Sequence, residues 1–566
     1  MAAVDFGTHG SGFAWCAIDR INDIPSDRKI FYFDQWRKQP VVYPKNLSAL
    51  LLDGKGTVLD WGYSARRALS TARAGGAAPS PRLVQGFKMW LRGGDDPVAG
   101  HLNGTPAQAL PLITAYLERL RKVAVRHITD GGYQENEIRW CLTVPAMWTD
   151  YQRDAMRKCA QKAGFPSTRE QLLLITEPEA AAIHALVRIP SGRTSSPIMM
   201  VDCGGGTIDI SAYLPGPNRH LAQLGHTTGG HLGSAYINER FLATVVRPRL
   251  GPDLVDELER TMPAAVQDMM DAFENAKMHH DAGRTERLSV SIPGQVYRLL
   301  LTRGRLEHLA RMQGGEDFHI ALDAKAADSL FEGVVRPLLY LVSERIVELR
   351  GLLPDDQKKI KVVVVGGFAQ SPYLRTRLTE FLGERYGTDV QVIIPPDPAR
   401  TVLAGAVHYA YEPEVVTSRT VGFTYGVECW LPFEEDVDPP RLRSRTDDGR
   451  TMCRDRFLTF TQIGESVEVD QEITQTLLPL LSDQEAVEFG FYASTEKTPR
   501  YISRNDARLL GSITIELGGA MKVPLDERAI DITLRFGGTE IEATALNQHT
   551  GQRMRTSLAF SPDTGS

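Results

Sequence analysis

Residues 198–214 read IMMVDCGGGTIDISAYL, and residues 2–18 read AAVDFGTHGSGFAWCAI, a variant of the same pattern. Each stretch predicts an apolar strand ending in an aspartate, a glycine-rich turn, and a second strand with period-two alternation. Because glycine has no Cβ atom, the N–H groups of such a turn can converge on phosphate oxygens. One such hairpin is also compatible with an ordinary turn. Two matched hairpins predict two phosphate-binding turns facing each other across a nucleotide cleft built by internal duplication.

Length and composition narrow the class of protein. A chain of 566 residues is too long for one hydrophobic core, so we expect at least two domains. The formal net charge is −6 and charges of both signs are mixed, which argues against a nucleic-acid partner. The chain begins with a predicted strand rather than a signal peptide, and no apolar run is long enough for a membrane span. We expect a soluble, cytoplasmic protein whose six scattered cysteines are reduced and do not bind zinc.

The order of predicted elements divides the chain. Strands alternate with helices up to residue 411, which predicts an α/β domain over residues 1–411. A strand pair is expected at 288–291 and 297–301. Residues 412–419 are expected to form a linker.

Beyond residue 420 the pattern changes to period-two strands, for example at 486–493, 511–517 and 530–536. We therefore expect an all-β domain over residues 420–566. The charged segment 434–456 is expected to form a long surface loop.

Side chains near the predicted turns have the chemistry that phosphoryl transfer requires. Asp5 and Asp202 stand at strand ends and are suited to hold hydrated Mg²⁺, which binds few carboxylates and several waters. Thr8 and Thr207 offer hydroxyl groups where a γ-phosphate would lie.

Three further segments are candidates for the same site. Glu177 precedes a proline at a strand-to-helix turn and is expected to order water around the metal; alternatively, it is a helix-start carboxylate stabilised by the macrodipole. The glycine pairs Gly229–Gly230 and Gly366–Gly367 would let the backbone come close to a bound nucleotide at two more places. These would serve the β-phosphate and the adenosine.

These segments together resemble the nucleotide-binding domain of the 70 kDa heat-shock chaperone (DnaK-like) family, within the actin and sugar-kinase ATPase superfamily. The matching segments, which span residues 1–411, are VDFGTHGSG, LTVPAMWTDYQRDAMRKCAQKAGF, ITEPEAAAI, VDCGGGTIDIS, TTGGHLGS, FENAKM and VVVVGGFAQSPYL. The resemblance implies a duplicated actin-like ATPase domain with two lobes around the cleft. The β-strand region is similar to the chaperone peptide-binding β-sandwich.

The resemblance implies ATP or ADP with Mg²⁺ as cofactors, and it assigns roles to individual residues. Asp5 and Asp202 are the implied metal residues. The implied catalytic residues are Asp202, Glu177, Thr207 and Arg66. The implied cofactor-binding residues are Gly7, Thr8, His9, Gly204, Gly205, Gly206, Thr207, Gly229, Gly230, Glu274, Lys277, Gly366 and Gly367.

The chain also departs from the family pattern. Arg66 stands where the Gly62–Arg66 segment would carry the family's catalytic lysine, and arginine differs from lysine in reach and geometry. Met278 and Gln370 replace the two arginines that enclose adenine. The acidic, leucine-containing linker and the helical lid are not found. These departures resemble the divergent heat shock 70 kDa protein 12 branch.

The leading hypothesis is therefore an atypical chaperone-like ATPase. Its β domain would bind a peptide or protein client, and a co-chaperone is a further candidate partner. Two alternatives remain open: a nucleotide-binding scaffold or filament-forming protein with little turnover, and a small-molecule kinase of the same fold.

Overall fold

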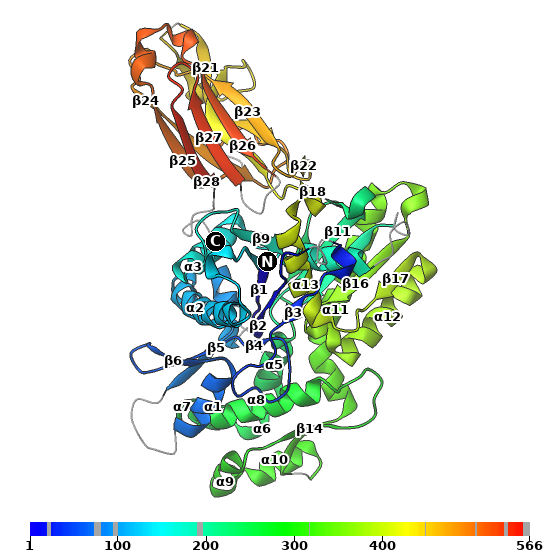
Figure 1. The fold of residues 1–566 in the computed structure, drawn as a ribbon. Coiled ribbons are helices and arrows are strands. Elements are labelled where there is room, and N and C mark those ends of the chain that lie inside the picture. Colours follow the sequence, from blue (N-terminus) through cyan, green and yellow to red (C-terminus); the bar gives the residue numbers. More distant parts are fainter. Residues whose placement is uncertain are drawn as a thin grey trace. The chain divides into compact units, whose positions relative to one another are not determined.

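The computed structural model describes residues 1–19, 24–72, 81–93, 100–188, 196–315, 317–447, 449–503, 506–536 and 541–558. The predicted α/β character is confirmed, because helices and several sheets alternate along the chain (Figure 1). The chain divides into two compact units. The first comprises Met1–Met147, Lys158–Pro215 and Thr228–Pro413, and the second comprises Trp148–Arg157, Gly216–Thr227 and Glu414–Ser566.

The first unit contains a sheet built around the N-terminal strand. Its order is β3-β2-β1-β8-β9, and β4 pairs with β2. Strand β1 is antiparallel to β2 and parallel to β8, so Asp5 lies opposite Gly12 on one side and Thr143 on the other. All five residues of β1 are buried, as expected for a central strand. The bounds are β1 Ala2–Phe6, β2 Gly10–Trp15, β3 Phe31–Tyr32, β4 Asn46–Leu47, β8 Trp140–Val144 and β9 Leu172–Thr176.

A second group of strands in this unit repeats the pattern. Strands β17, β16, β10 and β11 are neighbours in that order, and β13 pairs with β11. Strand β10 is antiparallel to β11 and parallel to β16, so Asp202 lies opposite Asp209 and Val365. Each hairpin thus has an aspartate on its first strand, between an antiparallel and a parallel neighbour. The bounds are β10 Ile198–Cys203, β11 Ile208–Pro215, β13 Thr228–Gly230, β16 Ile360–Val365 and β17 Val390–Ile393.

Helices α4 and α13 pack unusually closely in the first unit. A Cβ atom on Gly405 of α13 would lie 1.6 Å from the carbonyl oxygen of Ala180 in α4, so only glycine permits this contact. The helices of the unit are α1 Gly62–Ala72, α2 Pro106–Asp130, α4 Glu177–Arg188, α5 Ala235–Phe241, α6 Arg247–Leu250, α7 Pro252–Thr261, α8 Pro263–Lys277, α9 Gly294–Thr302, α10 Leu306–Gln313, α11 Ala324–Leu352, α12 Pro372–Tyr386 and α13 Pro398–Tyr411. Helix α3, Asp150–Lys162, contributes residues to both units.

Two small sheets complete this unit, and one of them corrects a prediction. The three-stranded sheet has the order β6-β5-β7, with β5 Ala49–Leu52, β6 Val58–Trp61 and β7 Arg82–Gln85. Strand β14, Leu288–Ser291, pairs with β15, His319–Leu322. The strand predicted at 297–301 is wrong, because these residues belong to α9. Val296 and Leu300 are both buried, and their spacing of four residues is helical.

The second unit is rich in strands. Its larger sheets have the orders β20-β21-β19-β24-β25 and β23-β26-β27-β28, and β18 pairs with both β12 and β22. Ile530, Ile532 and Leu534 on alternate positions of β26 are buried together with Val427 and Phe491 of the other sheet in one hydrophobic cluster. The bounds are β12 Leu221–Gln223, β18 Val416–Thr420, β19 Thr424–Pro432, β20 Arg443–Arg445, β21 Thr451–Thr461, β22 Ser466–Glu468, β23 Glu472–Leu477, β24 Ala486–Ser494, β25 Arg508–Glu516, β26 Ile530–Arg535, β27 Ile541–Asn547 and β28 Arg553–Leu558.

Two segments expected to be irregular contain regular structure. The expected linker at 412–419 includes a short 3-10 helix, Pro413–Val415, and most of β18. The expected surface loop at 434–456 includes β20 and the beginning of β21. Both segments therefore contribute backbone pairing to the second unit.

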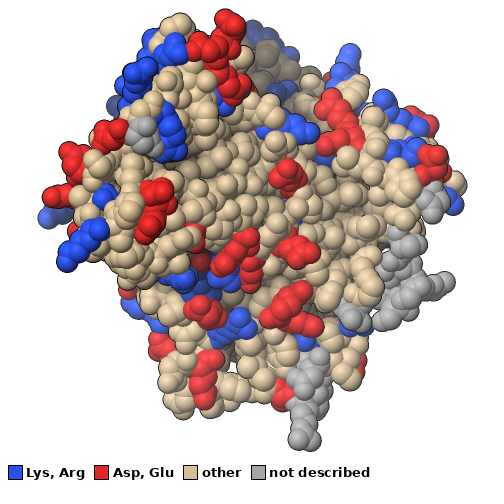
Figure 2. Space-filling model, turned by 90° about the horizontal axis from the view of Figure 1, so that it is seen from above, with Lys and Arg blue, Asp and Glu red and all other residues tan. Residues whose placement is uncertain are grey.

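Surface charge and cysteine state agree with the composition. In the face shown in Figure 2, acidic and basic side chains are interspersed rather than gathered by sign. All six cysteines are free, as predicted, and all six are buried. Within the residues that the structure describes, no helix is long and apolar enough to cross a membrane.

Candidate functional site

A cavity of about 330 Å³ lies in the first unit, between the turns that follow β1 and β10. Most of the residues predicted for the site line it. They are Asp5, Gly7, Thr8, His9, Glu177, Asp202, Gly204, Gly205, Gly206, Thr207, Glu274, Lys277, Gly366 and Gly367. Segments more than 350 residues apart in the sequence thus meet at one cavity, as the repeated hairpins predict.

The two glycine turns approach each other closely. A Cβ atom on Gly206 would lie 2.7 Å from Thr8 Oγ1, and one on Gly205 would lie 3.2 Å from the Cβ atom of His9. The second turn is supported by the start of α5, because the N–H of Ala235 donates to the Gly205 carbonyl at 2.8 Å. The glycines therefore leave backbone exposed to the cavity, and this cradle fits phosphate groups.

At one end of the cavity, both oxygens of the Asp5 carboxylate accept a hydrogen bond. Lys45 Nζ lies 2.5 Å from Asp5 Oδ2, and Thr143 Oγ1 donates to Asp5 Oδ1 at 2.9 Å. Burial opposes ionisation of Asp5, but the nearby Lys45 and Lys88 ammonium groups outweigh it, so the pKa of the carboxyl is lowered. Burial likewise opposes the charged form of Lys45, but Asp5 outweighs it and raises the pKa of the amine.

Glu177 and Lys88 form a second buried pair. Lys88 Nζ lies 2.8 Å from Glu177 Oε1, and Glu177 is the first residue of α4. Burial, together with the nearby Asp5, raises the pKa of Glu177 despite the attraction of Lys88. A lysine held in this position would present positive charge to phosphate groups.

Asp202 differs from both of these carboxylates. It is 5 % exposed, yet none of the hydrogen bonds or ion pairs found among the described residues uses its carboxylate. Burial raises its pKa well above the usual range, and the negative charges of Glu177, Asp209 and Asp5 act in the same direction. The Lys45 ammonium opposes this rise, but it makes no ion pair with Asp202 among the described residues. Asp202 is therefore a buried carboxylate without a direct polar contact, and this fits a site for hydrated Mg²⁺.

Glu274 and Lys277, two of the implied cofactor-binding residues, lie on α8. Lys277 Nζ lies 2.6 Å from Glu274 Oε2 and donates to Asn238 Oδ1 at 2.9 Å. Burial opposes ionisation of Glu274, but Lys277 and His9 outweigh it and lower the pKa of Glu274 to about 2. Burial lowers the pKa of His9, which favours its neutral imidazole.

Three predicted residues lie elsewhere among the described residues. Arg66, on α1, does not line the cavity and instead pairs with Asp271 of α8. The structure thus places Arg66 away from the cavity, whereas Lys45 and Lys88 line its Asp5 end; the catalytic role of Arg66 stays a prediction. Gly229 and Gly230 lie in β13, where a Cβ atom on Gly229 would be 2.4 Å from the Ile208 carbonyl oxygen.

The sequence reasoning missed Lys45 and Lys88. Each stands in a segment flanked by apolar residues, VVYPKNLSALLL and VQGFKMWL. A lysine inside an apolar segment is expected to be buried against an acidic partner, and this signal would have identified both.

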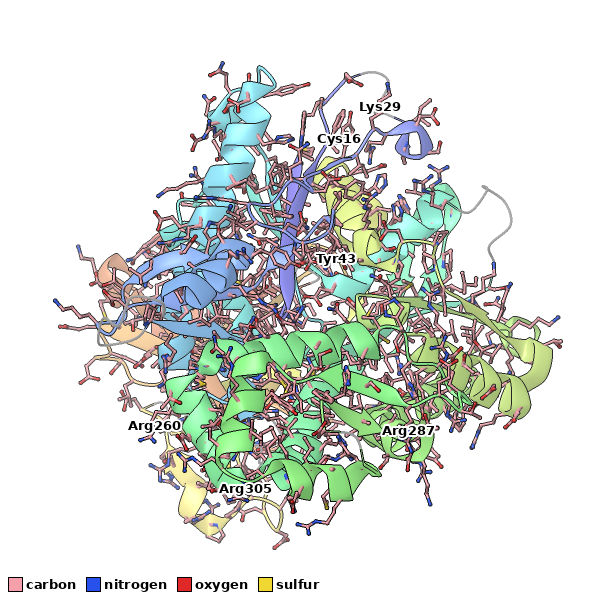
Figure 3. All side chains as sticks on the ribbon, turned by 90° about the horizontal axis from the view of Figure 1, so that it is seen from below. Cys16, Lys29, Tyr43, Arg260, Arg287 and Arg305 are labelled. Carbon is pink, nitrogen blue, oxygen red and sulfur yellow. The ribbon has the colours of Figure 1, made fainter. Side chains whose placement is uncertain are left out.

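The wall expected to enclose adenine has unusual chemistry. Tyr43, Met278 and Gln370 line it, and Gln370 Nε2 donates to the Tyr43 hydroxyl at 3.4 Å. No arginine lines the cavity among the described residues. Figure 3 shows Tyr43 near the middle of the view, with the labelled arginines Arg260, Arg287 and Arg305 in its lower part.

Comparison with known proteins identifies the family. A family model described as Hsp70 protein matches residues 111–410. The chain is 26 % identical to heat shock 70 kDa proteins 12A and 12B of Homo sapiens, over 99 % of this chain and 91 % of each relative. It is 26 % identical to the chaperone protein DnaK of Thermosipho melanesiensis, over 65 % of this chain and 56 % of that protein. The predicted resemblance is confirmed, and the chain belongs to the Hsp70 family of ATP-binding, chaperone-like proteins.

Proposed function

We propose that this chain binds ATP with Mg²⁺ in the cavity and hydrolyses it to ADP and phosphate. The observation that carries the proposal is the pair of glycine turns facing each other beside the buried carboxylate of Asp202, which makes no ion pair among the described residues. Backbone N–H groups suit phosphate oxygens, and a buried carboxylate with no hydrogen-bond partner suits a hydrated metal.

Each residue would have a distinct role. The hydroxyl groups of Thr8 and Thr207 would donate to the terminal phosphate. Asp202 would orient the attacking water and accept its proton. Lys88, held by Glu177, would stabilise the negative charge that develops on the transferred phosphoryl group.

Mg²⁺, when bound, would neutralise charge on the phosphate oxygens. Asp5 and Asp202 would hold its water molecules, and Glu177 would orient that water. Glu274 and Lys277 would contact the ribose and the base.

We further propose that nucleotide state is coupled to a peptide or protein partner, with a co-chaperone as a further candidate partner. Residues 1–411 would form a two-lobed ATPase domain, 412–419 a linker, and 420–566 a β-sandwich. The support for a peptide site is an edge strand, β23, on which half-buried residues alternate with exposed ones. An extended peptide would pair with such an edge through its backbone.

The test is titration of the purified full chain with ATP and Mg²⁺, followed by measurement of phosphate release. Wild-type protein is expected to bind and to release phosphate with ATP alone. Asp202→Asn is expected to retain binding and to lose turnover by about 100-fold or more. Unchanged turnover in D202N would contradict the role of Asp202, and release that requires a sugar or polyol would favour a kinase.

One observation favours the alternative of a nucleotide-binding scaffold with little turnover. Lys45 and Thr143 already bind both carboxylate oxygens of Asp5, so this metal-holding group is less available. Tight nucleotide binding with no phosphate release, together with sedimentation that increases with nucleotide, would support the scaffold.

A further inference from the structure

Lys45 is placed at the cavity by the packing of its own segment. It directly precedes β4, which pairs with β2 through Leu47 and Gly10. A Cβ atom on Gly12 of β2 would lie 2.3 Å from the Pro44 carbonyl oxygen, so this close approach requires glycine. Lys45 therefore reaches Asp5 from a backbone that is fixed by strand pairing.

The two strand-end aspartates are consequently not equivalent. Both oxygens of Asp5 accept hydrogen bonds, one from Lys45 and one from Thr143. The corresponding Asp202 on β10 has neither contact among the described residues. The duplicated hairpins thus give one aspartate in direct contact with the Lys45 ammonium and one that Lys45 influences only at longer range.

Mg²⁺ must compete with Lys45 for Asp5. The ammonium is 2.5 Å from the carboxylate, and its side chain is 14 % exposed. Removing one partner from a buried ion pair is strongly destabilising, because it leaves the other charge buried without compensation. Water bound to a metal would therefore not readily replace the Lys45 ammonium at Asp5. Of the two metal-holding carboxylates, Asp202 is then the more available to metal-bound water.

The Lys45 ammonium has more N–H donors than its contact with Asp5 uses. An ammonium group carries three N–H donors, and the contact with Asp5 uses one of them. Lys45 also lines the cavity that the two glycine turns enclose. A negatively charged phosphate group entering this cavity would therefore find a fixed positive charge on the Asp5 side.

We propose that Lys45 is a phosphate-binding residue that supplies, beside Asp5, part of the positive charge otherwise supplied by a divalent cation. This inference rests on the proposed nucleotide site and deepens it. Its consequence is that nucleotide binding depends only weakly on Mg²⁺. A purely structural ion pair between Lys45 and Asp5 would have no such consequence.

The test compares nucleotide affinity with and without Mg²⁺ in the full chain. ADP and ATP binding is measured by calorimetry in saturating Mg²⁺ and in excess EDTA, for wild type, Lys45→Met and Lys45→Gln. Lys55→Met is the matched control, because Lys55 is an exposed lysine in the turn between β5 and β6. Thermal unfolding checks that each variant is folded, and K45Q replaces K45M if the methionine variant does not fold.

Wild type and K55M are expected to change affinity by less than about threefold when Mg²⁺ is removed. K45M is expected to lose about tenfold or more in EDTA, which corresponds to one hydrogen bond to a charged group. Most of this loss should disappear in Mg²⁺, because the freed Asp5 can then hold metal-bound water.

Two results would overturn the role of Lys45 while leaving the proposed function intact. One is wild-type binding that falls more than about tenfold in EDTA. The other is a K45M affinity that changes by the same factor in both buffers, or does not change. Wild-type protein that binds neither ADP nor ATP in either buffer would instead overturn the proposed function, and the inference with it.

Discussion

The Lys88 ammonium lies 2.8 Å from Glu177 Oε1, and the two side chains are buried together at the cavity. Lys88 follows β7, whereas Glu177 begins α4, so the pair joins two elements of the first unit. Burial raises the pKa of Glu177, so the carboxylate depends on the lysine to remain charged. The pair therefore holds a cation at the cavity and an anion beside it.

Replacement of Lys88 by methionine should separate catalysis from binding. We expect K88M to lose turnover by about 100-fold or more, because the developing phosphoryl charge loses its cation. Nucleotide affinity should fall by less, about tenfold, because the glycine turns remain. Phosphate release and calorimetry measure the two effects.

Arg66→Met is the comparison, because Arg66 pairs with Asp271 outside the cavity. R66M should keep turnover within about threefold of wild type. The opposite ranking of K88M and R66M would support the catalytic role expected for Arg66.

The glycine turns and strand-end aspartates could be predicted because their chemistry is local. The segment VDCGGGTIDIS contains its strand, its turn and its carboxylate within eleven residues, and the structure brings this turn to the cavity. Period-two alternation likewise predicted β26, because successive side chains of a strand point to opposite faces of the sheet.

Pairings between distant segments could not be predicted in this way. Lys88 and Glu177 are 89 residues apart, and Lys45 and Asp5 are 40 apart. No local pattern states which carboxylate a buried lysine will meet, because tertiary packing decides it. The partner of Arg66 could not be predicted for the same reason: its side chain on α1 pairs with Asp271 of α8 and does not line the cavity.

Substitution of Gly405 by alanine should strongly destabilise the first unit. The new Cβ atom would lie 1.6 Å from the Ala180 carbonyl oxygen, and neither α13 nor α4 can move without disturbing the cavity wall. We expect a loss of about 3 kcal/mol or more in the free energy of unfolding, or no folded protein. Gly383→Ala in α12 is the control, because nothing lies within 4 Å of its Cβ position. G383A should stabilise the chain by up to about 1 kcal/mol. Urea unfolding of both variants measures this, and equal effects would contradict the close packing of α4 and α13.

The His184 imidazole should make the first unit less stable in mild acid. Burial, with a smaller contribution from Arg188, lowers the pKa of His184 to about 4, below the value of about 6.5 expected in the unfolded chain. The unfolded chain therefore takes up a proton that the folded chain does not, so stability is lost as pH falls from about 6.5 towards 4. By about pH 5 the loss should reach about 2 kcal/mol. Urea unfolding against pH measures it. His184→Leu should reduce the slope, and His279→Leu, at an exposed histidine, should not. Equal slopes in H184L and wild type would contradict this assignment.

Asp438 should anchor the charged segment 434–456 to the second unit. Its side chain is fully buried, accepts a hydrogen bond from the Tyr501 hydroxyl at 2.7 Å, and pairs with Arg456 at 3.1 Å. Asp438→Asn would remove the buried counter-charge of Arg456 and leave it only the exposed Glu434, so we expect a loss of about 2 kcal/mol in the unfolding free energy of this unit. Proteolysis within 434–456 should become faster at the same time. Asp436→Asn is the control, because Asp436 is exposed and has a φ of 63°, which asparagine tolerates well. Similar proteolysis of D438N and D436N would mean that the strand pairing of β20 with β21, rather than the buried charge, holds this segment in place.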